Sequence, residues 1–196
     1  MPTGGAAGAT NGPWLRGSSV VAAAKGGDNR QDSEPRTMDD TTALITALQT
    51  LNAPDAFRPR FGAEQWRVIA PFLTRHEVRA GDLLLRQGDG DRTMYFLERG
   101  NLQVYVTRAA GSPAPQQKIA ILRAGSVVGE GGLFGEGGRM ANVEAMTPCV
   151  LWALRGPRLE ELAARLPNLA FEIVRAAAAV MSVRMRANLE RGIAMS

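Results

Sequence analysis

Apolar residues recur at three- and four-residue steps near both ends of the chain and at two-residue steps in its middle. In the first third, this spacing predicts helices over residues 41–51 and 63–73. Near the C-terminus it predicts a short helix over 157–166 and a long one from Pro167 to about Arg191, each with proline in its first turn. Helices at both ends with strands between them indicate an α+β fold.

From Glu77 onward, short apolar runs alternate with turns rich in glycine and aspartate. Beyond the first such runs, further strands are expected at 117–122, 126–128, 141–145 and 150–154. Short strands separated by turns at this interval favour an antiparallel sandwich or a small barrel.

The pattern divides the chain into four parts. They are a disordered tail over 1–38, a helical segment over 39–60, a β-barrel over 61–156 and C-terminal helices over 157–196. The tail has few large apolar residues, so it cannot offset the entropy of its own ordering. Met38, followed by two aspartates, is an alternative start of the protein, in which case the residues before it are an addition.

The long final helix carries an apolar stripe along most of its length. About 25 helical residues span roughly 37 Å, which exceeds what a small barrel covers. We therefore expect part of the stripe to meet the same helix of a second copy, in a homodimer. Packing back onto its own domain is the alternative. The stripe consists of Leu169, Ile173, Val174, Ala177, Val180, Met181 and Leu189.

The composition of the chain excludes several kinds of functional site. The chain has one cysteine, Cys149, and one histidine, His76, which excludes an intramolecular disulfide and histidine-rich metal sites. The 23 basic and 19 acidic residues are interspersed, so no basic block predicts nucleic-acid binding. No apolar run reaches the roughly 18 residues of a membrane span. We expect a cytoplasmic protein without a membrane segment, a metal or a cofactor.

The densest chemical signal lies between Gly125 and Val143. Seven glycines occupy the 14 positions from Gly125 to Gly138, and they frame the acid Glu130 and the guanidinium of Arg139. Glycines let backbone amides converge on an anion, and an arginine in such a loop binds phosphate through two nitrogens. A nearby carboxylate accepts hydrogen bonds from sugar hydroxyls. The combination suits a ligand that contains ribose and phosphate.

The spacing of this segment resembles a known family. Gly129-Glu130, then eight residues, then Arg139-Met140-Ala141 is similar to the phosphate-binding cassette of cyclic nucleotide-binding domains. These domains occur in the catabolite activator family and in kinase regulatory subunits. Segments 81–89, 95–100 and 150–154 fall in the family's order, and the resemblance covers about residues 61–190. It implies a jelly-roll barrel, or double-stranded β-helix, between N-terminal helices and a long C-terminal helix.

The resemblance also implies roles for individual residues. Arg139 would neutralise the cyclic phosphate, and Glu130 would accept a hydrogen bond from the ribose 2′-hydroxyl. The final helix would close over the base. The implied ligand-binding set is Gly129, Glu130, Gly131, Gly132, Arg139, Met140 and Ala141, with base contacts from Met181, Arg184 and Met185.

Five positions depart from the family's usual pattern. Gly131-Gly132 replaces apolar residues, and each glycine costs about 1 kcal/mol in a helix interior. Gly138 replaces a common proline. Met140 and Asn142 replace small or hydroxyl residues, and the hydroxyl lost at Met140 favours guanine in cGMP-selective members. We expect a looser cassette that binds cAMP weakly, with cGMP or a cyclic dinucleotide as alternatives.

These features predict a stand-alone, non-enzymatic regulatory protein that senses a cyclic nucleotide. The sequence ends at Ser196 without a helix-turn-helix segment, so we expect no direct DNA binding. The signal would then pass to a separate effector protein. The alternative is a degenerate domain that serves as a dimeric protein-interaction scaffold without a ligand.

Overall fold

The computed structural model describes residues 38–108, 116–135 and 137–192. The tail expected to be disordered lies outside these residues up to position 37. Position 136 of the glycine-rich segment also lies outside them. The boundaries between the four expected parts of the chain stay predictions.

Two helices precede the strands. Helix α1 runs over Met38–Thr50 and buries Leu44 and Leu48. Helix α2 covers Ala63–Ile69 and continues as the 3-10 turn η1, Ala70–Phe72. The sequence pattern predicted one helix over 63–73. Pro71 lacks a backbone N–H and disfavours α geometry in the residue before it, so the helix tightens there instead of continuing.

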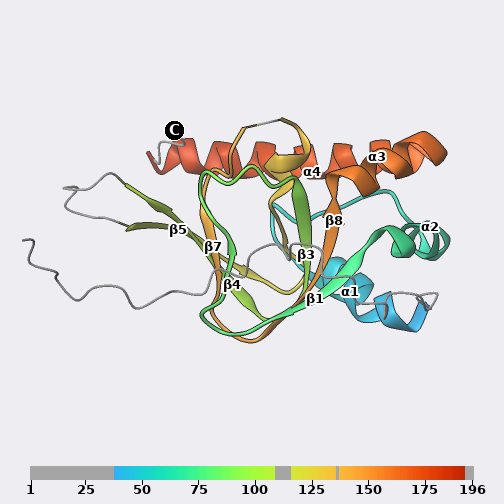
Figure 1. The fold of residues 1–196 in the computed structure, drawn as a ribbon, viewed down its shortest axis with the longest axis horizontal. Helices are drawn as coiled ribbons and strands as arrows, with labels where there is room; N and C mark the ends of the chain where they lie inside the picture. The colour runs from blue at the N-terminus through green and yellow to red at the C-terminus, as the bar shows by residue number, and fades with distance from the viewer. Residues whose placement is uncertain (1–37, 109–115, 136, 193–196) are drawn as a thin grey trace, which may run out of the picture.

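Eight strands form two four-stranded antiparallel sheets in the order β1-β8-β3-β6 and β2-β7-β4-β5. The sheets pack face to face as an open roll, which confirms the predicted antiparallel β architecture between helices (Figure 1). The strand bounds are β1 Thr74–Val78, β2 Leu83–Leu85, β3 Thr93–Arg99, β4 Asn101–Thr107, β5 Gln116–Arg123, β6 Val127–Val128, β7 Asn142–Ala145 and β8 Cys149–Arg155.

Strand β3 shows how the roll separates two cores. Met94 and Phe96 belong to a cluster shared with the helices, whereas Leu97 and Tyr95 belong to a cluster between the two sheets. Adjacent residues of a strand point to opposite faces, so one apolar strand serves both cores. Cys149, at the start of β8, is a buried free thiol of the inter-sheet cluster.

Two helices follow β8: α3, Gly156–Arg165, and α4, Pro167–Glu190. Helix α4 runs along one side of the roll, and its residues Ile173, Ala177 and Val180 lie in the helix-side core (Figure 1). Much of the apolar stripe therefore packs onto its own domain. Among the described residues, no helix is both long enough and apolar enough to cross a bilayer.

Candidate ligand-binding site

The glycine-rich segment leaves β6 through a tight turn. Gly129 has φ of 78°, and a Cβ there would lie 2.7 Å from the carbonyl oxygen of Thr93. Only glycine satisfies both constraints without strain. The 3-10 turn η2, Glu130–Leu133, follows directly and places Glu130 at its first position. The backbone thus fixes the orientation of the cassette acid.

Arg139 lies on the return path of the segment, and its side chain is only 4% exposed. Its Nη1 donates to the carbonyl of Gly129 at 2.8 Å, next to Glu130. Its Nη2 donates to the carbonyl of Thr93 at 2.6 Å and to Asp91 Oδ2 at 2.5 Å. Its Nε is buried and has no hydrogen-bond partner in the described part of the chain. The guanidinium therefore cross-links three segments and keeps one donor unused.

Asp91 is the counter-ion of this buried cation. Burial by itself raises the pKa of Asp91. Hydrogen bonds from Thr93 and Arg139, together with the Arg139 charge, outweigh burial and hold the pKa below its ordinary value of 3.8. The Thr93 hydroxyl donates to Asp91 Oδ1 at 2.7 Å. The carboxylate is thereby ionised at neutral pH and oriented by both neighbours.

Gly132 has a steric reason to be glycine. A Cβ at this position would lie 2.6 Å from Arg139 Nη1 and 3.1 Å from the carbonyl oxygen of Asp91. From the sequence alone, this glycine is expected only to disfavour helix formation. In the structure it also makes room for the guanidinium, so its absent side chain is part of how the cassette holds Arg139.

Glu130 has a different partner. Its side chain is 10% exposed, and Oε1 accepts a hydrogen bond from Arg184 Nη1 of α4 at 2.8 Å. Arg184 also donates from Nε to Asp55 Oδ2 at 2.8 Å and from Nη1 to the carbonyl of Val127 at 3.0 Å. Burial by itself lowers the pKa of Arg184, but Glu130 and Asp55 hold it above its ordinary value. One cation thus joins α4, the cassette and the segment after α1.

Most of the remaining predicted residues lie around the same turn. Gly131 lies beneath two methionines, because a Cβ there would be 3.1 Å from Met140 Cε and 3.9 Å from Met181 Cε. Met140 is 48% exposed, and Ala141 is half-buried just before β7. Met185 is 61% exposed and points to the surface rather than into the cassette. The structure therefore places Met181 and Arg184, but not Met185, beside the cassette.

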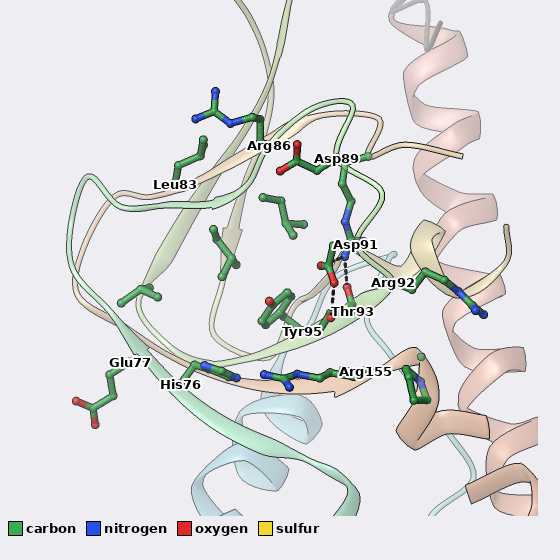
Figure 2. A pocket seen from close by; sticks show the side chains of 16 residues that line it. His76, Glu77, Leu83, Arg86, Asp89, Asp91, Arg92, Thr93, Tyr95 and Arg155 are labelled. Carbon is green, nitrogen blue, oxygen red and sulfur yellow. Dashed lines mark hydrogen bonds and ion pairs between the residues drawn. The ribbon is translucent and has the colours of Figure 1, made fainter. Parts of the chain in front are cut away.

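A cavity of about 400 Å³ opens beside Arg139, on the β1–β2 side of the roll (Figure 2). Arg139, Asp91 and Thr93 line it, and Glu130 does not. The guanidinium contacts the backbone next to Glu130, yet the two charged groups bind different partners. Their expected convergence on one ligand stays a prediction.

Two functional neighbours escaped the sequence pattern. Asp91 lies in a turn, Gly88-Asp89-Gly90-Asp91, whose composition predicts a loop and nothing more. Asp55 lies between the prolines that follow α1. Asp91 pairs with Arg139 of the cassette and Asp55 pairs with Arg184 of α4, and each partner is far away in sequence. The one signal that could have drawn attention to Asp91 is its place two residues before a buried strand.

Residues 75–165 match the family model described as the cyclic nucleotide-binding domain. The cAMP-dependent protein kinase regulatory subunit of Colletotrichum trifolii is 30% identical over 133 residues, which cover 65% of this chain and 33% of that protein. The chain spans about a third of the length of the first curated relatives it matches.

Two solved structures are similar in fold. A cyclic nucleotide-binding domain from Methylobacillus flagellatus KT superposes with a TM-score of 0.67 at 19% identity, covering 79% of this chain and 83% of that one. The catabolite activator protein of Thermus thermophilus gives 0.56 at 26% identity, covering 75% of this chain and 62% of that one. Residues 75–165 of this chain therefore belong to the cyclic nucleotide-binding domain family.

Proposed function

We propose that this chain is a non-enzymatic regulator that binds a cyclic nucleotide, cAMP, in the cassette and passes the signal to a separate partner protein. One observation carries the proposal: a buried carboxylate, Glu130, and a buried guanidinium, Arg139, flank the backbone of Gly129 within a domain of this family. The relative from Colletotrichum trifolii, a cAMP-dependent regulatory subunit by name, makes cAMP the first ligand to test. A cytoplasmic location is part of the proposal.

The link between Glu130 and Arg184 supports a route for the signal. A ribose hydroxyl that donates to Glu130 competes with Arg184 for the same carboxylate. Because Arg184 belongs to α4, the ligand would then have a different affinity for arrangements of that helix with and without the Arg184–Glu130 hydrogen bond. Differential affinity is the condition for ligand-driven switching.

The outer face of α4 is where the signal would leave the domain. Phe171, Met185 and Leu189 are each more than 60% exposed there. We propose that this face forms a homodimer or contacts the effector. Sedimentation velocity of the chain with and without cAMP measures whether it forms a homodimer and whether cAMP changes that state.

A thermal-shift screen with cAMP, cGMP and cyclic di-GMP tests the ligand assignment. The proposal expects cAMP to raise the melting temperature in a concentration-dependent manner, because a ligand that binds only the folded state stabilises it. Arg139→Lys keeps the charge but loses the planar fork, so the shift should shrink. Arg165→Lys, on the exposed face of α3, is the matched control.

The scaffold alternative has one observation in its favour. Arg139 is bonded to Asp91 and two carbonyls, and Glu130 is bonded to Arg184. The two charged groups of the cassette are therefore paired within the chain itself. A screen in which no cyclic nucleotide shifts the melting temperature would favour the scaffold.

A further inference from the structure

The cavity beside Arg139 is separate from the cassette turn. It opens between β1, β2 and β3, and its volume of about 400 Å³ lies within the range of about 300–1,000 Å³ that is usual for small-molecule sites. Leu83, Leu85 and Val78 supply apolar walls, and Tyr95 lies at its centre (Figure 2). Neither Glu130 nor Met181 lines it.

The charges around this cavity do not cancel. Of its acids, Glu77 pairs with Arg75 and Asp91 pairs with Arg139, which leaves Asp89. The side chains of two of its arginines, Arg86 and Arg155, form no hydrogen bond or ion pair with any residue that the structure describes. Figure 2 shows them on opposite sides of Tyr95. The cavity therefore presents two unpaired cations against one unpaired acid.

The start of α3 adds to this positive field. Arg155 is the residue before the helix, Gly156 and Pro157 line the cavity, and the first turn contains no acid. The Gly156 amide donates to the carbonyl of Arg92 at 2.8 Å, which fixes the helix start against the loop before β3. A helix N-terminus carries about half a positive charge, so it favours an anion beside Arg155.

Buried donors complete the inner wall. Arg139 lines the cavity, and its buried Nε has no partner among the described residues. Tyr95 is largely buried. Burial first, and then the charge of Asp91, raises the pKa of its phenol, while Arg139 and Arg155 act in the opposite direction. The hydroxyl therefore stays protonated at neutral pH and can donate to an acceptor. Both arginines are close enough to act on the same hydroxyl.

We propose that this cavity is a second ligand site, for a small organic anion with an apolar or aromatic body. The anionic group lies between Arg155 and the start of α3, and the apolar body packs against Leu83, Leu85 and the Tyr95 ring. The site does not depend on cyclic nucleotide binding. Arg139 contacts both this cavity and the backbone of Gly129, so an occupant here also touches the residue that holds the cassette.

Titration of the isotope-labelled full chain with benzoate, followed by amide chemical shifts, tests the site. Benzamide, which is neutral and of similar shape, is the matched control ligand. We expect saturable shifts at Leu83–Arg86 and Arg155–Gly156 with a dissociation constant of about 1 mM or below. Arg155→Gln should weaken benzoate binding about tenfold or more, because a charge-assisted hydrogen bond is lost. Arg165→Gln, on the same helix but outside the cavity, should leave it unchanged.

Glu130→Gln separates this site from the cassette. That variant should leave the affinity for benzoate unchanged, whether or not it changes the affinity for cyclic nucleotides. Loss of benzoate binding in Glu130→Gln, equal affinity for benzamide, or no saturable shift at the named amides would each overturn the second site. A cAMP titration of the same sample tests ligand binding at the cassette independently. Either proposed site can therefore be refuted without affecting the other.

Discussion

Arg184 of α4 donates a 2.8 Å hydrogen bond to Glu130, the acid that the family resemblance assigns to the ribose. The same guanidinium binds Asp55, so the C-terminal helix, the cassette and the segment after α1 share one ion-pair network. In the proposed function, ligand binding at Glu130 would therefore be coupled to the position of α4 through a single side chain.

Replacing that side chain should both destabilise the domain and uncouple α4. Arg184→Met leaves two partly buried carboxylates without their cation, which costs about 3 kcal/mol of unfolding free energy. Urea unfolding measures this loss. Arg186→Met, an exposed arginine on the same helix, is the control and should change the unfolding free energy by less than about 0.5 kcal/mol. Equal stability of the two variants would contradict the network.

The Arg139–Asp91 pair predicts a defined acid sensitivity. The folded-state pKa of Asp91 lies below 3.8, so ionised Asp91 stabilises the fold above that pH. Its contribution falls as the pH drops through 3.8 and is lost below the lowered folded-state pKa. Asp91→Asn removes the charge at every pH.

Urea unfolding of wild type and Asp91→Asn from about pH 7 to about pH 2 measures this contribution. The stability gap, about 2 kcal/mol near neutrality, should close in acid. A gap that stays constant down to the acid limit would show that Asp91 acts only through packing.

The glycines of the cassette give a matched pair of substitutions. Gly132→Ala places a methyl group 2.6 Å from Arg139 Nη1, so we expect a loss of about 2 kcal/mol in unfolding free energy. Gly137→Ala meets no atom within 4 Å and should be neutral or slightly stabilising. Thermal unfolding of both variants checks the difference. Similar melting temperatures would mean that the turn adjusts around Arg139.

The family and the cassette could be predicted from the sequence because their signals are local. Gly129-Glu130 and Arg139 have a fixed spacing, and the alternation of short apolar runs predicts the sheets. The network around them could not be predicted. Asp91 and Arg139 are 48 positions apart, and Asp55 and Arg184 are 129 apart. No periodicity encodes such pairings, because they depend on how the strands and α4 pack.

Helix α4 is a second element whose packing could not be predicted from the sequence. Its stripe of small and apolar residues is compatible with a dimer and with intramolecular packing. The structure buries Ala176, Ala177 and Val180 within the same chain, and leaves Phe171 and Leu189 outside. The shape of the surface that an amphipathic helix packs against decides which of its residues are buried. That shape cannot be derived from the hydrophobic pattern of the sequence.

Calorimetric titration of cAMP into the wild-type chain and into Glu130→Gln tests whether Glu130 holds a bound cyclic nucleotide. We expect saturable binding of one cAMP per chain to the wild type, and affinity weaker by about tenfold or more in the variant, because the side chain can no longer accept a charge-assisted hydrogen bond from the ribose. Equal affinity in the two proteins, or no binding to the wild type, would contradict it.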